Sequence, residues 1–277
     1  MKTGLVLEGG AMQGIYTVGV LDVFMENNIK FDGVIGVSAG ALFGCNYISG
    51  QKGRALRYCK KYNPDKNYMG LLPFIKYGDV VNVEYAYERV PKILDPFDNE
   101  AFMQSDIPFW AVVTNMETGK AEYIQIKDVF KQMDDLRASG TMPYLSKPVL
   151  KDGIRYMDGA VADSIPFEAM FELGFDRLVV VLTKHLGYVK KPLPQTLSRL
   201  MYGRKSPLFD EAVRNRHIMY NGQKERLFKA SELGNIDIIL PSEALYISKT
   251  EKNPAKLDSL YNLGRKDALL YLTNVNK

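Results

Sequence analysis

The first fifty residues repeat one pattern, a short apolar strand followed by a turn and an apolar helix. The run at 5–7 ends in the loop 8–14, and a largely apolar helical pattern follows over 14–27. The run at 33–37 leads directly into a second apolar helical pattern over 39–49. Two such units in close succession are typical of a parallel sheet with crossover helices. The repeat therefore predicts an α/β fold.

Later segments extend this pattern. An irregular stretch that favours helices covers 52–105, and the runs at 109–114 and 121–126 flank the hairpin turn 117–120. Further strands are predicted at 154–157, 178–182 and 236–240, and further helices at 128–138, 164–173 (with Ser164 as N-cap) and 255–272. We expect a single domain over 1–277, because the chain contains no repeat or linker. The segment 236–273 would then supply its closing strand and helix.

Charge and hydropathy exclude several classes of protein. The chain has 36 Lys+Arg and 32 Asp+Glu, which gives a formal charge of +4. This charge is too small to indicate a particular kind of partner, and we expect no nucleic-acid ligand. No run approaches the roughly 18 apolar residues of a membrane span, and the N-terminus turns acidic at Glu8, too early for a secretory signal. Cys45 and Cys59 are too few for a disulfide framework and lack metal-ligand spacing. We predict a cytoplasmic protein without a metal site.

One segment carries more positive charge than the chain as a whole. Between Asp176 and Asp210 there are seven lysines and arginines and no acidic residue. Leucines and aromatic residues are interleaved with them over 184–209. Such a segment suits an anionic lipid surface or an acidic partner, or it is a solvated loop and short helix beside a site. We interpret it as a basic excursion from the domain and as a candidate for peripheral contact with an anionic membrane.

The sequence Gly36-Val37-Ser38-Ala39-Gly40 stands where the second predicted strand turns into its helix. In this context G-x-S-x-G is typical of a strained turn that lifts a nucleophilic serine out of the sheet, at the positive end of a helix. Glycine is needed on both sides because the strand and helix approach too closely for a Cβ. The pattern favours Ser38 as a nucleophile over a plain glycine-rich turn.

The loop 8–14, Glu-Gly-Gly-Ala-Met-Gln-Gly, lies between the first strand and its helix. Successive glycine amides at a helix start form an anion-binding concavity, which in an acyl-transfer enzyme would hold the oxyanion of the tetrahedral intermediate. A dinucleotide fingerprint fails at Ala11, its second glycine. A phosphate-binding P-loop fails because Ile15 and Tyr16, rather than Lys and Ser or Thr, follow Gly14. A phosphate cradle stays the weaker alternative.

Asp158-Gly159-Ala160 follows the predicted strand 154–157. An aspartate at the carboxyl end of a strand is a natural position for a catalytic carboxylate, although an Asp-Gly pair is also a common turn, as we interpret 152–153. The order Ser38, Asp158, His185 matches that of α/β-hydrolase triads, whereas His217 has the pattern of a surface residue. The residues alone therefore leave two bases open, His185 in a triad or Asp158 in a dyad.

Together these motifs resemble those of the patatin-like phospholipase family. The family carries an oxyanion loop, G-x-S-x-G and D-G-G/A in this order, here at 8–14, 36–40 and 158–160. The stretch 138–149, with Ala-Ser-Gly-Thr-Met-Pro and then Lys-Pro-Val, is similar to the segment that precedes the family's aspartate. The resemblance covers the motif-bearing part, 4–185. It implies a three-layer α/β/α sandwich with a mainly parallel central sheet, and a serine hydrolase that needs no metal or cofactor.

The resemblance also implies a role for each matching residue. Ser38 would be the nucleophile and Asp158 the general base of a dyad without histidine. The amides of Gly9, Gly10 and Ala11 would be the oxyanion donors. Gly14, Gly36, Gly40, Gly159 and Ala160 would support the motifs. One position departs from the pattern, because Gln13 replaces the usual arginine of the loop and removes a positive charge.

The function implied is the hydrolysis of lipid carboxylic esters through an acyl-enzyme. The substrates would be those of a phospholipase A, a lysophospholipase or a general esterase, which would place the protein in lipid degradation. Two alternatives stay open. An acyltransferase or thioesterase would use the same acyl-enzyme, and a non-catalytic lipid-binding module would be compatible with the change at Gln13.

Overall fold

The two N-terminal strand–turn–helix units build the centre of the structure, a computed structural model that describes residues 1–275. β1 (Thr3–Leu7) leads through a 3-10 turn to α1 (Ile15–Glu26), and β2 (Gly33–Val37) leads to α2 (Ala39–Ile48). β1 pairs in parallel with β2 on one side and with β7 (Arg177–Val181) on the other. Both central strands are almost entirely buried, which explains their unbroken apolar sequences.

The complete sheet has eight strands, in the order β5-β6-β3-β2-β1-β7-β8, with β4 paired to β3. Its other strands are β3 (Phe109–Asn115), β4 (Ala121–Ile126), β5 (Val149–Lys151), β6 (Ile154–Asp158) and β8 (Ile236–Ile239). The pairs around β1, β2 and β7 are parallel, whereas β4, β5 and β6 run antiparallel to their neighbours. The predicted central parallel sheet and the β3–β4 hairpin are confirmed.

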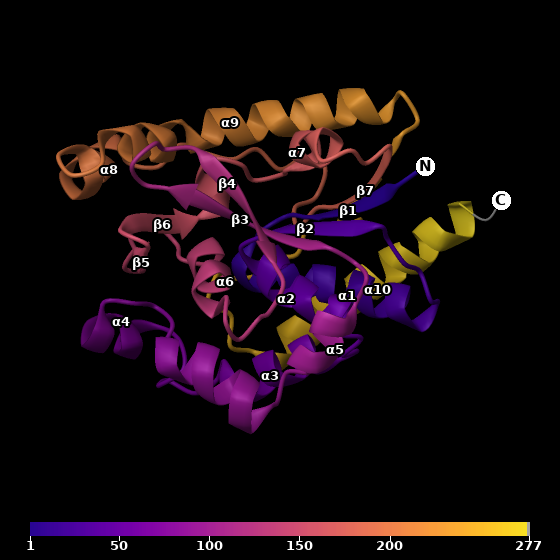
Figure 1. Cartoon of the computed structure of the whole chain (residues 1–277), viewed down its shortest axis with the longest axis horizontal. Helices are drawn as coiled ribbons and strands as arrows, with labels where there is room; N and C mark the ends of the chain where they lie inside the picture. The colour runs from indigo at the N-terminus through magenta and orange to yellow at the C-terminus, as the bar shows by residue number, and fades with distance from the viewer. Residues whose placement is uncertain (276–277) are drawn as a thin grey trace.

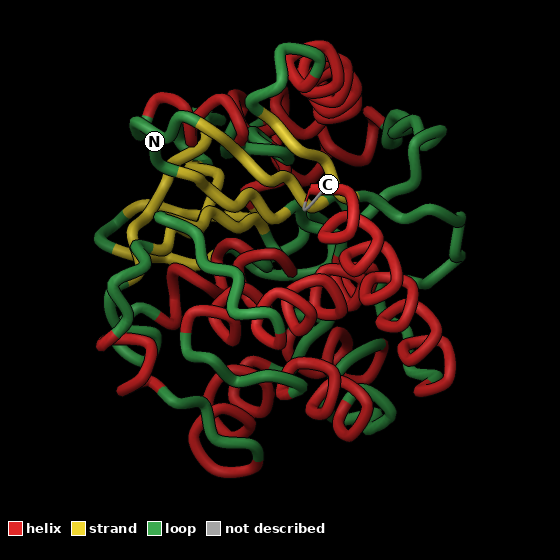
Figure 2. Tube along the Cα trace, turned by 90° about the vertical axis from the view of Figure 1, so that its right-hand side faces the viewer, coloured by secondary structure: helices red, strands yellow, loops and turns green. Residues whose placement is uncertain are grey.

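Helices cover both faces of this sheet (Figure 1). α7 (Phe167–Glu172) and α9 (Pro207–Ser231) lie along one face, and α1, α2 and α10 (Pro254–Val275) lie on the other. Figure 2 shows the strands between one long helix above and a larger group of helices below. The three-layer α/β/α sandwich is confirmed.

The remaining helices lie outside this frame or at its edges. They are α3 (Arg54–Tyr62), α4 (Leu71–Tyr77), a π-helical segment (Glu84–Leu94), α5 (Asn99–Gln104), α6 (Met133–Ser139), α8 (Gln195–Ser198) and a second π-helical segment (Arg199–Gly203). The helical character predicted for 52–105 is thereby confirmed. The basic segment 184–209 contains α8, the second π-helical segment and the start of α9.

Two predicted helix starts are wrong. α6 begins at Met133 rather than at 128, because the Asp128 side chain accepts the backbone N–H groups of the next residues and holds 128–132 in turns. α7 begins at Phe167, and Ser164 does not cap it. The Ser164 hydroxyl instead donates to the Ala160 carbonyl at 2.8 Å.

The C-terminal elements join the same sheet and the same helical layer. β8 pairs in parallel with β7, and α10 packs along α1. The two helices cross with their backbones in contact: a Cβ on Gly19 would lie 2.1 Å from the Tyr261 carbonyl oxygen, and one on Gly264 would lie 2.0 Å from the Tyr16 carbonyl oxygen. Glycine at both positions therefore sets the distance between α1 and α10.

We expect Gly264→Ala to lower the free energy of unfolding by about 1–3 kcal/mol, because the added methyl group overpacks this crossing. Gly222→Ala is the matched control in the interior of α9, where a Cβ would meet only the far end of the Arg226 side chain at 3.5 Å. It should stabilise the fold by up to about 1 kcal/mol through helix propensity. Urea unfolding of both variants measures the difference, and equal shifts would contradict the close crossing.

Candidate active site

Ser38 lies at the sharp turn between β2 and α2. Its backbone has φ 54° and ψ −120°, in a region that residues with side chains rarely adopt. A Cβ on Gly40 would lie 2.3 Å from the Leu7 carbonyl oxygen, and one on Gly36 would lie 2.6 Å from the Ala41 nitrogen. The strand and the helix thus approach too closely for any residue but glycine at either position, as the G-x-S-x-G pattern predicts.

The Ser38 hydroxyl donates a hydrogen bond to Asp158. Ser38 Oγ lies 3.0 Å from Asp158 Oδ2, and Asp158 Oδ1 accepts the Ala160 N–H at 2.9 Å. The two residues are 6% and 3% exposed. A Cβ on Gly159 would lie 2.2 Å from the Val112 carbonyl oxygen, so the turn after Asp158 packs directly on β3. The structure brings together the two residues that the sequence predicts as nucleophile and base.

The strand order explains why these two residues meet. Val37, the last residue of β2, pairs with Val112 of β3. One residue further along β3, Val113 pairs with Asp158, the last residue of β6. Because β2 runs parallel and β6 antiparallel to β3, the carboxyl ends of β2 and β6 point toward each other. Ser38 follows one of these ends, and Asp158 closes the other.

The segment 138–143 holds the backbones of both residues. The Ser38 N–H donates to Ser139 Oγ at 2.9 Å, and the Asp158 N–H donates to the Thr141 carbonyl at 2.9 Å. Thr114 Oγ1 adds a hydrogen bond to the Asp158 carbonyl at 2.8 Å. The sequence singled out this segment through the family resemblance, but nothing in its pattern indicated that Ser139 and Thr141 join Ser38 to Asp158.

The glycine-rich loop packs against Ser38. A Cβ on Gly9 would lie 2.9 Å from Ser38 Cβ. Among the hydrogen bonds within residues 1–275, none uses the backbone N–H of Gly9, Gly10 or Ala11. The loop is anchored by Glu8, whose Oε2 accepts the Thr183 N–H at 2.5 Å and the Thr183 hydroxyl at 3.1 Å. Unpaired amides beside a serine hydroxyl have the position that oxyanion stabilisation requires.

The Asp158 carboxyl group titrates in an unusual environment. Burial raises its pKa above the ordinary aspartate value. The positive charge of Arg216, the Ala160 N–H, the Ser38 hydroxyl and the charge of Lys190 each act in the opposite direction, in decreasing order of effect. A carboxylate with a raised pKa is a stronger base, which removes part of the objection that an ordinary aspartate is too weak to accept a proton from serine.

The structure places the two histidines in different cavities. His185 lines one cavity together with the nearby residues Thr183 and Tyr188. It does not line the cavity that contains Ser38 and Asp158. His217, which we interpreted as a surface residue, lines that cavity from α9. Its Nδ1 lies 3.0 Å from the Arg214 carbonyl oxygen.

Helical spacing is the signal that could have found this face of α9. Val213, Arg216 and His217 stand at i, i+3 and i+4, so they project from one side of the helix, and all three line the cavity. We interpreted His217 as a surface residue and missed this shared face. Lys249, far along the chain, also lines the cavity, and no local pattern marks it.

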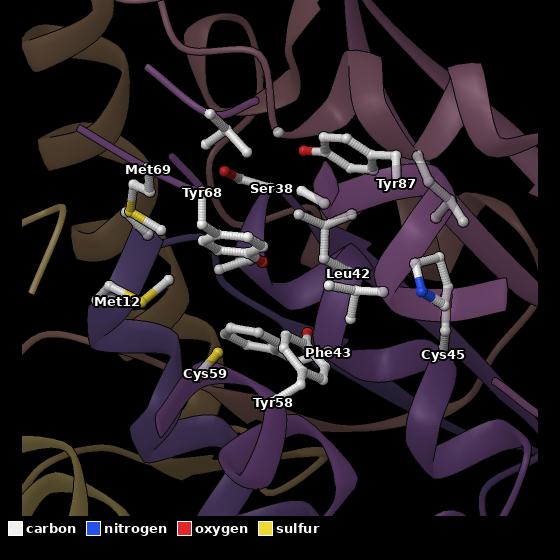
Figure 3. Close-up of a pocket in the computed structure, with 18 of the residues that line it drawn as sticks. Met12, Ser38, Leu42, Phe43, Cys45, Tyr58, Cys59, Tyr68, Met69 and Tyr87 are labelled. Atoms are coloured by element: carbon white, nitrogen blue, oxygen red, sulfur yellow. The ribbon is translucent and has the colours of Figure 1, made fainter. Parts of the chain in front are cut away.

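Two cavities meet at Ser38. One, of about 150 Å³, is lined almost entirely by apolar and aromatic side chains of α2, α3 and the segment 81–97. Figure 3 shows Ser38 at its edge, with Leu42, Phe43, Tyr58 and Tyr68 around the space beside it. The other, of about 530 Å³, is more polar and contains Asp158, the loop 8–11 and several basic side chains. Four residues line both cavities: Ala11, Ser38, Met142 and Lys249.

Within residues 1–275, no group of three or more His, Cys, Asp or Glu side chains could hold a metal ion. In the same range, no helix is both long and apolar enough to cross a bilayer. Cys45 and Cys59 are buried free thiols, and burial raises the pKa of Cys45 to about 12 and that of Cys59 further. Neither thiol has the exposure of a reactive cysteine.

Comparison with known families assigns the chain. A family model described as patatin-like phospholipase matches residues 5–171, more than half of the chain. The protein therefore belongs to the patatin-like phospholipase family. A second model, a domain of unknown function (DUF6363), matches residues 206–277.

Several curated proteins are similar over much of the chain. The uncharacterized protein YjjU of Escherichia coli (strain K12) is 26% identical, and the match covers 100% of this chain and 78% of YjjU. Lysophospholipase nte1 of Aspergillus niger is 25% identical over 73% of this chain and 13% of its own length. Among solved structures, VipD from Legionella pneumophila matches with a TM-score of 0.48 and 16% identity, over 99% of this chain and 67% of VipD. Membership of the family and the lysophospholipase relatives support a lipid ester hydrolase.

If Asp158 accepts the Ser38 proton, the acidic limb of the rate profile should report its ionisation. We expect kcat/KM to rise with pH and then to level off. The midpoint of this rise should lie above about 3.9, the pKa of an exposed aspartate, because burial raises the pKa of Asp158. Initial rates on an activated ester between pH 4 and 9 measure it. A limb at or below the ordinary value would contradict this assignment.

Protein stability checks the same pKa independently of activity. The pKa of Asp158 is higher in the folded state than in the unfolded state, so the folded state favours the protonated carboxyl group. The resulting stabilisation is fully present below the unfolded-state pKa and is lost as pH rises through the folded-state pKa. At pH 7 Asp158→Asn should therefore raise the thermal midpoint. Ser38→Ala, which keeps the buried charge, is the control, and a lower midpoint for Asp158→Asn would count against the shift.

Proposed function

We propose that this protein is a serine acyl hydrolase that cleaves lipid carboxylic esters through a Ser38–Asp158 dyad. The observation that carries the proposal is the 3.0 Å hydrogen bond from Ser38 Oγ to Asp158 Oδ2, placed where an apolar and a polar cavity meet. An acyl ester has the same division, with an apolar chain on one side of the carbonyl and a polar leaving group on the other.

The proposed reaction follows from the positions of these groups. Asp158 accepts the Ser38 proton as Ser38 Oγ attacks the ester carbonyl carbon. The N–H groups of Gly9, Gly10 and Ala11 stabilise the oxyanion, and the proton held by Asp158 passes to the departing alkoxide as the ester C–O bond breaks. Water then attacks the acyl-enzyme with Asp158 again as base, which releases the fatty acid and restores the serine.

The apolar cavity is proposed to hold the acyl chain. It extends from Ser38 past Leu42 and Phe43 of α2 toward Cys45 and Tyr58 (Figure 3). Burial of a methylene group contributes about 0.8 kcal/mol, so a chain of several carbons would gain enough to hold the ester carbonyl beside the oxyanion loop. The whole chain is proposed to act as one domain, because β8 and α10 complete the sheet and layer that carry this cavity.

We expect a fluorophosphonate probe to label the protein covalently at Ser38, because the probe reacts with activated serines. Ser38→Ala should abolish labelling, and Asp158→Asn should reduce labelling and ester turnover by at least about a hundredfold through loss of the base. His185→Ala is the matched control and should keep both. Mass spectrometry of the labelled peptide identifies the site.

The alternatives give different results in this experiment. Loss of activity in His185→Ala with retention in Asp158→Asn would overturn the dyad in favour of a triad. Absence of label on folded protein would favour a lipid-binding module. Label on Ser38 together with transfer of the acyl group to an added alcohol or thiol, rather than to water, would indicate an acyltransferase.

The protein is also proposed to work peripherally at an anionic membrane. Leu186, Val189 and Leu200 in the basic segment 184–209 are largely exposed, and so are Leu71 and Ile75 of α4. Figure 1 shows α8 and α4 projecting on the same side of the molecule. Exposed leucines among lysines and arginines suit insertion into the headgroup region of anionic lipids.

Vesicle sedimentation tests this surface. Leu200 is 84% exposed, and Leu200→Glu should weaken binding to vesicles containing phosphatidylserine by about tenfold or more, because one buried leucine contributes about 1.5–3 kcal/mol. Leu233→Glu is the matched control, since Leu233 is 82% exposed but lies beyond the other end of α9. Binding that ignores both anionic lipid content and salt would contradict the proposal.

A further inference from the structure

The polar cavity beside Ser38 carries an excess of positive charge. Its lining includes five basic side chains (Lys184, Lys190, Lys191, Arg216 and Lys249) and only two carboxylates, Glu8 and Asp158. Fifteen ion pairs join other charged residues of the described chain, 1–275, and none of them involves any of these five. The five basic side chains around the candidate nucleophile therefore have no carboxylate partner within ion-pair distance in the described chain.

Two of these side chains are held firmly in place. The Asn221 side chain accepts the Lys190 N–H at 2.9 Å and donates to the Lys190 carbonyl at 3.0 Å, which fixes the loop to α9. The Lys190 ammonium group then lies 4.0 Å from the centre of the Tyr220 ring. Arg216 Nε donates to the Ala160 carbonyl at 2.8 Å, two residues after Asp158. These cations are therefore positioned before any ligand arrives.

The surroundings make this arrangement unfavourable without a counter-ion. Burial and the neighbouring charge of Arg216 lower the pKa of Lys190 well below the ordinary lysine value, and the same two causes lower the pKa of Lys249. Burial also lowers the pKa of Lys184. Bringing several cations together in a partly enclosed space is unfavourable unless an anion completes the site. A group with more than one negative charge would complete the site formed by the five basic side chains.

We propose that this cavity binds a phosphate group on the leaving-group side of the ester, and that the preferred substrate is an acylated glycerol phosphate. This rests on the proposed function. A phosphomonoester carries nearly two negative charges and three acceptor oxygens, which several convergent cations match and a single carboxylate does not. The acyl chain would occupy the apolar cavity across Ser38, so the phosphate can only face the basic one.

The same assignment explains the departure at Gln13. This residue, where the family usually has arginine, lines the polar cavity. Positive charge reaches the cavity instead from α9, through Arg216, and from the basic segment, through Lys184 and Lys190. In this chain the positive charge of the cavity therefore comes from the walls that would face the leaving group and not from the oxyanion loop.

Three esters that share one acyl chain test the proposal: 1-oleoylglycerol 3-phosphate, 1-oleoylglycerol-3-phosphocholine and neutral 1-oleoylglycerol, each assayed as monomers at low salt. We expect kcat/KM to be highest for the phosphomonoester and at least tenfold above that for the neutral ester, with the difference shrinking as salt is added. Glycerol 3-phosphate should inhibit hydrolysis of 1-oleoylglycerol competitively, and glycerol should not. The inhibition experiment needs no variant.

The double variant Lys190→Gln with Lys249→Gln should reduce the preference for the phosphomonoester over the neutral ester by about tenfold or more. The matched control, Lys30→Gln with Lys229→Gln, removes the same charge from exposed positions away from the cavity and should leave the ratio unchanged. Equal turnover of the three esters, or no inhibition by glycerol 3-phosphate, would overturn the phosphate site while leaving the hydrolase intact. Failure to turn over any ester, with no fluorophosphonate label, would instead refute the proposed function.

Discussion

The contact of the first turn of α2 with the ends of β1 and β2 is the constraint on which the site depends. Because Gly40 lies against the Leu7 carbonyl and Gly9 lies against Ser38, the serine and the glycine-rich loop share one small volume at the edge of the sheet. Ser38 can adopt its strained backbone only because the strand and helix on either side are buried and hold it. The stability of the central sheet thus maintains a local conformation that is unfavourable by itself.

The mixed direction of the sheet supplies the second half of the site. A wholly parallel sheet would place the carboxyl ends of neighbouring strands side by side. Here β6 runs antiparallel to β3 and meets β2 end to end, so Asp158 reaches the Ser38 hydroxyl without any intervening residue. The segment 138–143 then ties the two ends together through Ser139 and Thr141. The proposed dyad would need no third residue in this geometry, because the base and the nucleophile belong to adjoining backbone ends.

The division of the surroundings into two cavities would place each side of an ester in a different environment. The apolar side is built from α2, α3 and the segment before β3, whereas the basic side is built from α9 and the segment after β7. The second group of elements lies in and next to the region that matches a separate family model, 206–277. The chemistry would then reside in the patatin-like part, and the C-terminal part would shape the choice of leaving group.

The sequence by itself determined the α/β class, the central strands and the candidate residues Ser38 and Asp158, because buried strands and glycine-flanked turns are local signals. It placed helix starts at 128 and 164 wrongly, since single side-chain hydrogen bonds of Asp128 and Ser164 override composition there. Only the tertiary structure decided which titratable groups surround Ser38. His217, predicted as a surface residue, lines the cavity that contains Ser38 and Asp158, whereas His185 lines another cavity. Lys249 joins the first cavity from a distant loop. Chain order carries no information on such contacts, which depend on how β7, α9 and the C-terminal loop pack together.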